Sequence, residues 1–405
     1  MAFSFLGHIF QYAPVKFVAL TQNSSTSRIQ VIALKGCNLT KSGVYAIGNY
    51  CNIYCKGRIM KVGIGLSGGI DSSLAAWRLL HDGHDVVGYT MAVVPGKTVG
   101  DDAARAADFL HIPLRLLDFS ETFEKQVLEP FVEEYASGLT PSPCVWCNAK
   151  LKFGLLAEAM LADGCDAVAT GHYARLKTDE SNPLRTRLFH GIDPVKDQSY
   201  FLAQVDQRQF RHVVFPLGNM LKDDVRKLAV QLGLPAAEKK ESQDLCFLND
   251  ETFSQFILRR RPEMNAPGWI VTEDGRRLGR HDGAFRYTIG QRRGLGLGGG
   301  PWFVSRIDMA DNLVIVAHGG EAAVSGCRLS KMNYFVEDGR IARPIEGDAQ
   351  IRYRMKPRKA TVVPCDGAMA ELQFDSPVES VTPGQLAVLY DRDEVIASGW
   401  IEPFE

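Results

Sequence analysis

Residues 60–73 read MKVGIGLSGGIDSS, in which a short apolar run passes directly into a segment of glycine and serine. The run Lys61–Leu66 is typical of a buried strand, and the amphipathic stretch Ser72–His81 predicts a helix. Glycine lets the backbone approach an anion closely, while serine hydroxyls and the first turn of a helix favour negative charge. The stretch therefore predicts a strand–loop–helix unit that binds phosphate in its loop.

Two common nucleotide-binding motifs are missing from this loop. It lacks the lysine of the GxxxxGKS/T loop and the GxGxxG spacing of a dinucleotide site. The alternative interpretation is a helix start rich in serine and glycine that binds no ligand. The loop alone thus indicates phosphate binding, and it does not indicate which substrate accompanies the phosphate.

The residues that follow this unit alternate between apolar runs and amphipathic stretches. Further strands are predicted at Val86–Met91, Leu114–Leu117 and Ala167–Ala169. Further helices are predicted at Asp101–His111, Thr122–Tyr135, Asn148–Leu161 and Lys222–Leu232. Alternation at this spacing predicts an α/β domain with a doubly wound parallel sheet, covered by helices on both faces.

A different pattern begins near residue 252. Asp274-Gly275 and Asp282-Gly283 are hairpin-type turns, and Gly294–Gly300 is a glycine-rich loop. From about residue 321, short strands separated by turn residues predict a small antiparallel β-barrel. We therefore expect an extension at 1–59, the α/β domain at 60–251, a small central domain at 252–320 and a C-terminal β-barrel at 321–405.

Composition restricts the class of protein. Of 405 residues, 45% are hydrophobic and 23% are charged, and no apolar run approaches the roughly 18 residues of a membrane span. Disordered, fibrous and membrane-spanning proteins are therefore excluded. Residues 1–59 carry six basic and no acidic side chains, so the remainder carries a net charge of −7. Binding to nucleic acid would therefore rely on local basic patches.

Three interpretations of residues 1–59 stay open. The acid-poor, serine-containing segment fits an organelle transit peptide, although two arginines are few for one. It also fits a genuine extension. The third interpretation is upstream sequence read in frame, with Met60 as the true start. This one is favoured, because codons for Lys56-Gly57-Arg58 can spell a purine-rich ribosome-binding site just before Met60. Detection of a peptide from residues 1–59 in the native protein would exclude it.

The cysteines indicate reactive thiols. Nine of them at irregular spacing, without a secretory signal, indicate free thiols in a reducing cytoplasm. Cys144 and Cys147 form a CxxC in a proline-rich loop before a predicted helix, whose start is expected to lower the pKa of a thiol. The alternatives are half of a zinc site for this pair and a buried small hydrophobe for Cys246.

The loop GLSGGIDSS (65–73) resembles the PP-loop of the N-type ATP pyrophosphatases. With seven further motifs, the chain from Met60 onward resembles the bacterial tRNA-specific 2-thiouridylase family. These motifs are TPSPCVWCNAKLKFG (140–154), ATGHYAR (169–175), KDQSYFL (196–202), ESQDLCFL (241–248), YTIGQRRGLGLGG (287–299), RYR (352–354) and PGQ (383–385). The resemblance covers almost all of residues 60–405 and implies a PP-loop fold, ATP and Mg²⁺ as cofactors, and tRNA as partner.

The resemblance also implies a reaction. ATP would adenylate O2 of the wobble uridine in tRNA, and a cysteine persulfide would then deliver sulfur to C2. Cys147 corresponds to the nucleophile of the family, and Cys246 corresponds to the carrier of the persulfide, which a donor or relay protein supplies. The cycle would leave a Cys147–Cys246 disulfide for an external reductant to open.

Binding residues carry over from the family position by position. The implied nucleotide-binding residues are Gly65, Leu66, Ser67, Gly68, Gly69, Ile70, Asp71, Ser72, Met91 and Gly171, with Asp71 also a ligand of Mg²⁺. The implied tRNA-binding residues are Ser142, Pro143, His172, Lys196, Asp197, Gln198, Arg352, Tyr353 and Gln385. A guanidinium for phosphate and a ring for stacking suit RNA, and chemistry on a base requires the base to be unstacked. For His172 an ordinary turn histidine is the alternative.

One position departs from the family pattern. Cys144 stands where many members carry an aspartate with a proposed role as general base, and a thiol could take that role only if it ionised. Cys144, Cys147 and Cys246 could instead ligate an iron–sulfur cluster. Two other functions stay open: a PP-loop ligase acting on a small molecule, and an iron–sulfur RNA-binding protein with a vestigial loop. We expect a monomer in the cytoplasm, with no membrane partner.

Overall fold

The computed structural model describes residues 58–94, 101–179, 182, 185–237, 245–248, 251–318, 323–335, 343–365 and 368–404. The segment 1–59 therefore lies outside the described residues except for Arg58 and Ile59. All features below belong to Asn49–Glu405, one of two units into which the chain divides. Among the helices described, none is long and apolar enough to cross a membrane.

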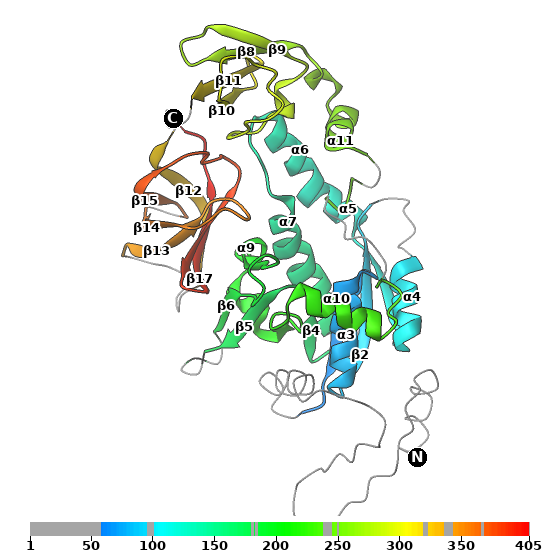
Figure 1. The fold of residues 1–405 in the computed structure, drawn as a ribbon. Helices are drawn as coiled ribbons and strands as arrows, with labels where there is room; N and C mark the ends of the chain where they lie inside the picture. The colour runs from blue at the N-terminus through cyan, green and yellow to red at the C-terminus, as the bar shows by residue number, and fades with distance from the viewer. Residues whose placement is uncertain are drawn as a thin grey trace, which may run out of the picture. The chain divides into compact units, whose positions relative to one another are not determined.

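A five-stranded parallel sheet forms the first domain (Figure 1), with strand order β3-β2-β1-β4-β7. Its strands are β1 (Lys61–Gly65), β2 (Asp85–Ala92), β3 (Leu114–Asp118), β4 (Ala167–Ala169) and β7 (Val213–Val214). The central strand β1 pairs in parallel with β2 on one side and with β4 on the other. The apolar runs predicted as strands from the sequence are strands β1 to β4, which confirms the parallel sheet.

Helices cover both faces of this sheet, because successive side chains of a strand point to opposite faces. Val62 and Ile64 of β1 pack in one cluster with α3 (Ile70–His81), α4 (Asp101–Leu110) and α10 (Lys222–Gln231). The opposite face packs against η1 (Glu124–Leu128), α6 (Glu129–Ala136), η2 (Cys147–Leu156) and α8 (Ala157–Ala162). Gly63 faces this second layer, where a Cβ atom would lie 2.8 Å from Cγ of Met160. The predicted doubly wound arrangement is confirmed.

Short helices complete this first domain and lead into the second. They are α5 (Ser120–Phe123), α7 (Pro143–Trp146), α9 (Ser199–Leu202), η3 (Gln207–His212) and α11 (Phe253–Arg260). The four-stranded sheet that follows has the order β10-β11-β8-β9. Its strands are β8 (Gly268–Thr272), β9 (Arg277–His281), β10 (Trp302–Asp308) and β11 (Leu313–His318). The predicted turn at Asp274-Gly275 joins β8 to β9, with Gly275 at a φ of +82°.

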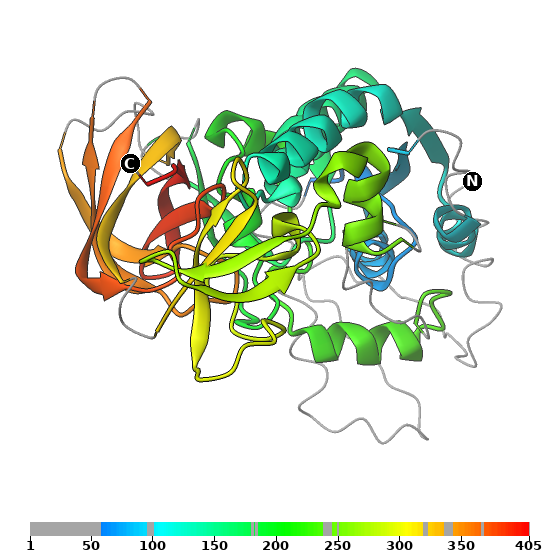
Figure 2. The same cartoon turned by 90° about the horizontal axis from the view of Figure 1, so that it is seen from above.

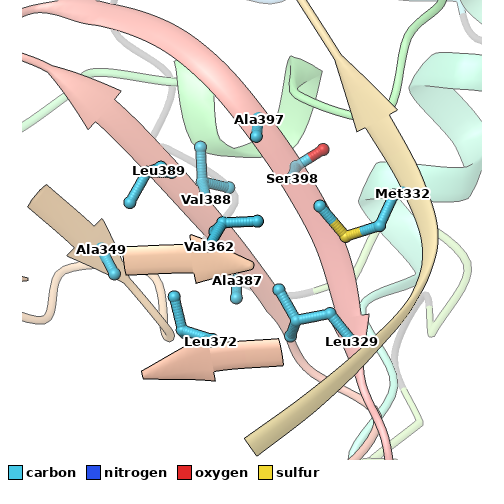
Figure 3. Close-up of a pocket in the computed structure, with 10 residues that line it drawn as sticks. All are labelled: Leu329, Met332, Ala349, Val362, Leu372, Ala387, Val388, Leu389, Ala397 and Ser398. Carbon is cyan, nitrogen blue, oxygen red and sulfur yellow. The ribbon is translucent and has the colours of Figure 1, made fainter. Parts of the chain in front are cut away.

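The C-terminal strands close into an antiparallel barrel of six strands. They are β12 (Val324–Tyr334), β13 (Ile345–Gln350), β14 (Arg358–Pro364), β15 (Ala370–Val378), β16 (Leu386–Asp391) and β17 (Glu394–Ile401). Closure follows from β12, which pairs with both β15 and β17. Apolar side chains fill the interior (Figure 3), and the space among them is too small for a water molecule. The predicted barrel is confirmed.

One connection between the first domain and the barrel was not predicted. The hairpin of β5 (Ala174–Thr178) and β6 (Thr186–His190) continues the barrel sheet, because β6 pairs with β17 through Phe189 and Glu394. The hairpin and β17 lie side by side in both views (Figures 1 and 2). The segment 191–199 that follows β6 contacts the start of α10 through Asp193 and the barrel through a hydrogen bond between Ser199 and Tyr390.

Candidate active site

The loop between β1 and α3 is held in shape by its own serines. Ser67 donates from its backbone nitrogen to Oγ of Ser72 at 3.2 Å, and Ser72 Oγ donates to the carbonyl oxygen of Gly69 at 3.1 Å. Gly68 has a φ of +74°, and a Cβ atom there would lie 2.2 Å from the backbone of Asp102. Position 68 therefore requires glycine. The loop opens a helix of 12 residues, whose amino-terminal end favours an anion.

The predicted nucleotide-binding residues gather around this loop. Gly171 follows β4, and a Cβ atom there would lie 2.8 Å from the carbonyl carbon of Asp71 and 2.9 Å from the nitrogen of Ser72. Met91 lies half-buried near the end of β2. Because β2 and β4 flank β1, these positions share the carboxyl edge of the sheet, where ligands of such folds bind.

Asp71, predicted to bind Mg²⁺, has both carboxylate oxygens engaged by the protein. The ammonium of Lys222 donates to Oδ1 at 2.7 Å and to Oδ2 at 2.8 Å. The hydroxyl of Tyr173 donates to Oδ1 at 2.7 Å. Sequence reasoning missed both partners. Tyr173 lies within the motif ATGHYAR, so the motif offered a signal, whereas Lys222 was recognised only as the start of a helix.

The thiols do not have the lowered pKa that was expected. Helix α7 runs directly into η2, so Cys147 is the fifth residue of a continuous helix and does not lie at its start. Burial raises the pKa of Cys147 to about 12, and the charges of Cys246 and Cys144 add to this effect. Burial also raises the pKa of Cys144, although part of this residue is exposed. The prediction from the helix start was wrong, because loss of water outweighs the helix dipole here.

The interaction of Cys246 with both other thiols shows that the three lie within electrostatic reach of one another. No disulfide joins Cys147 to Cys246 in this state. Within the described part of the chain, no three histidine, cysteine, aspartate or glutamate side chains are grouped to hold a metal ion.

Lys152 is a third residue that sequence reasoning missed, although it lies in the motif 140–154. Its positive charge opposes the rise in the pKa of both Cys144 and Cys147. Both Lys152 and Cys147 lie on η2, whose helical geometry is interrupted by a kink at Gly154.

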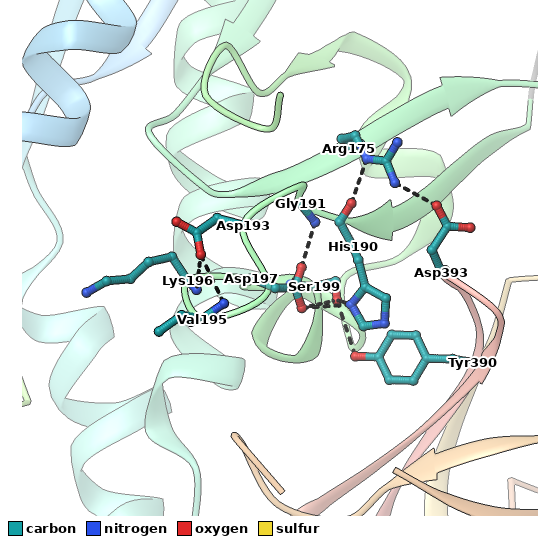
Figure 4. Close-up of polar contacts among 10 residues, drawn as sticks. All are labelled: Arg175, His190, Gly191, Asp193, Val195, Lys196, Asp197, Ser199, Tyr390 and Asp393. Carbon is teal, nitrogen blue, oxygen red and sulfur yellow. Dashed lines mark hydrogen bonds and ion pairs between the residues drawn. The ribbon is translucent and has the colours of Figure 1, made fainter. Parts of the chain in front are cut away.

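Several predicted tRNA-binding residues are engaged inside the protein. His172 is buried, its Nδ1 lies 2.7 Å from Oγ1 of Thr170, and burial lowers its pKa well below the usual value. Asp197 accepts hydrogen bonds from the backbone nitrogen of Gly191 and from Oγ of Ser199 (Figure 4). Gln198 accepts one from the backbone nitrogen of Tyr173 through Oε1. Lys196 lies half-buried on the same segment.

Between them, the predicted residues of the barrel contact the loop that precedes Cys144, the central domain and helix α9. Nε2 of Gln385 donates to the carbonyl oxygen of Thr140. Ser142 and Pro143, which follow Thr140 in the same loop, are both buried. Arg352 donates to the carbonyl oxygen of Ile289 and to Oγ1 of Thr382. The ring of Tyr353 packs on Phe201, 4.4 Å between centroids. The structure thus joins central domain, barrel and cysteine loop at one place.

A parallel sheet with a phosphate loop after its first strand, followed by two β domains, defines an α/β nucleotide-binding protein with appended β modules. Residues 60–250 match the family described as "tRNA methyl transferase HUP domain". Residues 254–318 match "tRNA methyl transferase PRC-barrel domain", and residues 324–401 match "Aminomethyltransferase beta-barrel domain".

The names of individual relatives specify the reaction more closely than the descriptions of the domain families do. The tRNA-specific 2-thiouridylase MnmA of Syntrophotalea carbinolica is 43% identical over 347 residues, which cover 84% of this chain and 97% of that protein. The proteins of the same name from Geotalea uraniireducens and Nostoc punctiforme are 41% and 40% identical, over 84% and 85% of this chain and 95% and 99% of theirs. The chain belongs to the tRNA-specific 2-thiouridylase family.

Proposed function

We propose that this protein is an ATP- and Mg²⁺-dependent tRNA uridine 2-sulfurtransferase. It replaces O2 of the wobble uridine with sulfur from a cysteine persulfide. The observation that carries this function is the presence of a phosphate loop and the interacting thiols Cys147 and Cys246 in a chain of the 2-thiouridylase family. A phosphate loop alone suits many adenylating enzymes, whereas two neighbouring thiols supply both a sulfur carrier and a nucleophile.

The first step activates the base. O2 of the uridine attacks the α-phosphorus of ATP, which releases pyrophosphate and leaves an adenylated oxygen at C2. Residues 65–72 and Gly171 surround the phosphates, and the thioether of Met91 packs against adenine. This placement is supported by the loop geometry and by the close approach of Gly171 to that loop. Mg²⁺ bound with ATP supplies positive charge to the phosphates.

The second step delivers sulfur. An external persulfide donor or relay protein loads Cys246, and the terminal sulfur of this persulfide attacks C2 while AMP leaves. Cys147, as a thiolate, then attacks Sγ of Cys246, which breaks the S–S bond and releases the thiolated base. The resulting Cys147–Cys246 disulfide takes two electrons from an external reductant. Lys152 favours the thiolate of Cys147 that this step needs.

The remaining parts of the chain hold the tRNA. We place the domains at 60–251, 252–320 and 321–405, supported by the family matches to 60–250, 254–318 and 324–401. Lys196, Arg352 and Tyr353 contact the tRNA beside the cysteine loop, while Ser142, Pro143, His172, Asp197, Gln198 and Gln385 shape the surface that receives it. The enzyme acts as a monomer in the cytoplasm. The steps above use Cys147 and Cys246 as thiols, and an iron–sulfur cluster on Cys144, Cys147 and Cys246 is not part of this proposal.

The test is nucleoside mass spectrometry on unmodified tRNA incubated anaerobically with protein, ATP, Mg²⁺ and a persulfide donor. Wild type is compared with Cys147→Ser and Cys246→Ser, and Cys365→Ser serves as the control, because Cys365 is an exposed free thiol of the barrel. We expect 2-thiouridine from wild type and control, and none from the other two variants. Cleavage of ATP to AMP without any 2-thiouridine would instead indicate a ligase that acts on another substrate.

A further inference from the structure

Lys152 brings a positive charge to the cysteines that no acidic side chain of the described residues neutralises. The residue is half-buried on η2, and within the described part of the chain its ammonium makes no hydrogen bond or ion pair. Its nitrogen is also accessible to solvent. On the same helix, by contrast, the ammonium of Lys150 donates to the carbonyl oxygen of Gln126 at 3.3 Å. The charge of Lys152 is therefore available to a ligand.

The groups within electrostatic reach of Lys152 are themselves uncharged at neutral pH. Burial raises the pKa of Cys147 to about 12 and raises the pKa of Cys144 as well, and the charge of Lys152 acts on both thiols. Lys152 also acts on His172, whose pKa burial lowers well below its usual value. A cation that is partly withdrawn from water is stabilised by an anion. Because these neighbours supply no anion, we expect the substrate to supply it.

The fold connects Lys152 to the phosphate loop as well as to the thiols. The ring of Phe153, the next residue of the chain, packs against the ring of His172, 5.7 Å between centroids. His172 directly follows Gly171, where a Cβ atom would lie 2.8 Å from the carbonyl carbon of Asp71 in the loop. The thiols of Cys144 and Cys147 and the residue beside the phosphate loop are thus all within reach of one positive charge.

The proposed reaction places one particular phosphate between the loop and the thiols. C2 of the uridine has to lie beside the thiols to receive sulfur, and in the adenylate a single oxygen separates C2 from the phosphorus of AMP. The loop on the other side holds the phosphates that ATP loses as pyrophosphate. The phosphate of the adenylate therefore lies in the region where Lys152 acts.

We infer that Lys152 is a catalytic residue whose ammonium binds the phosphate of the adenylated uridine. While O2 attacks, the ammonium stabilises the negative charge of the α-phosphate. When the terminal sulfur of the persulfide anion then forms its bond to C2, the C2–O bond breaks, and its electron pair stays on the oxygen that leaves with AMP. The phosphate thereby gains negative charge beside a cation that is already in place, which favours this step. The inference rests on the proposed function and goes beyond the influence of Lys152 on the thiolate of Cys147.

The experiment measures tRNA-dependent exchange of labelled pyrophosphate into ATP, which reports adenylation without any sulfur donor. The parent is the full chain with Cys147→Ser and Cys246→Ser, so that no effect passes through these two thiols. At saturating tRNA we expect Lys152→Met to slow the exchange at least tenfold, and Lys152→Arg, which keeps the positive charge, to stay within threefold of the parent. Lys150→Met is the matched control, because this exposed lysine lies on the same helix. An unchanged rate for Lys152→Met, or an equal loss for Lys152→Arg, would overturn the inference.

A second measurement separates the phosphate of AMP from a phosphate of the tRNA backbone. The affinity for unmodified tRNA is measured without ATP by filter binding, and we expect Lys152→Met to leave it within twofold of the parent. An affinity at least tenfold weaker, together with an exchange rate that recovers fully at saturating tRNA, would identify a backbone phosphate as the ligand and contradict the inference. Absence of exchange in the parent itself, with Lys152 intact, would instead contradict the proposed function, and the inference would fall with it.

Discussion

Nε2 of Gln385, in the barrel, donates a hydrogen bond to the carbonyl oxygen of Thr140, 2.6 Å away, in the loop that leads to Cys144. The backbone nitrogen of Thr140 in turn donates to the carbonyl oxygen of Pro383 at 3.0 Å. Residues more than 240 positions apart thus form a closed pair of hydrogen bonds between the first domain and the barrel. The barrel consequently supports the cysteine loop directly.

Substitution of Gln385 by glutamate should loosen this loop. The carboxylate keeps the size of the side chain but has no N–H to donate, and it places a negative charge near a carbonyl oxygen. The lost hydrogen bond corresponds to about 1–2 kcal/mol, so exchange of the Thr140 amide should accelerate roughly fivefold or more. Hydrogen–deuterium exchange of the segment 139–143 measures this. Gln373→Glu, on the exposed face of the same barrel, should leave the segment unchanged.

Gly171→Ala should damage nucleotide binding. The added Cβ would lie 2.8–3.0 Å from backbone atoms of Asp71 and Ser72, which cannot rotate away as a side chain could. Overpacking of this kind costs about 1–3 kcal/mol, which predicts a weaker affinity for ATP by about one order of magnitude. Gly298→Ala is the matched control, because a Cβ atom there meets no atom within 4 Å. Equal ATP affinity for both variants would show that the phosphate loop shifts to accommodate the added methyl group without loss of affinity.

The sequence predicted the parallel sheet and the barrel because their signals are local. The run Lys61–Leu66 and the turn at Asp274-Gly275 each depend on residues next to one another. The pairing of Phe189 with Glu394 has no such signal, since the hairpin joins the barrel through a contact 205 residues away in the chain. A sequence pattern shows how polar and apolar side chains alternate along a strand, but it does not show with which other strand that strand pairs.

The same distinction between local signals and long-range contacts applies to the candidate site. The serines and glycines of the loop are contiguous, so their role could be predicted from spacing and chemistry. Lys222 reaches Asp71 across 151 positions, which only the tertiary fold establishes. The pKa of Cys147 could not be predicted either, because the helix start is visible in the sequence and the burial that dominates it is not.

His172 should make the stability of the protein depend on pH. Its pKa in the folded state is well below 6.5, because the ring is buried against Phe153 and Phe215. Below pH 6.5 the unfolded chain binds a proton that the folded chain does not, so stability falls as the pH falls, by up to about 1.4 kcal/mol per unit. We expect the urea midpoint to drop between pH 7 and pH 5.5 and His172→Gln to reduce this drop. The exposed His212→Gln should retain it.

The thiol of Cys147 should be unreactive without substrate, and Lys152 should control what reactivity it has. With a pKa of about 12, roughly one molecule in ten thousand carries the thiolate at pH 8, so alkylation by iodoacetamide should accelerate about tenfold per unit between pH 7 and pH 10. Lys152→Met removes the positive charge that opposes this rise in pKa, and it should slow alkylation of Cys147 at every pH in that range. Lys150 lies on the same helix and does not contribute to the pKa of Cys147, so Lys150→Met should match wild type. Peptide mapping by mass spectrometry separates Cys147 from the other cysteines. Rapid alkylation at pH 8, or equal rates for Lys152→Met and Lys150→Met, would show that burial does not govern this thiol.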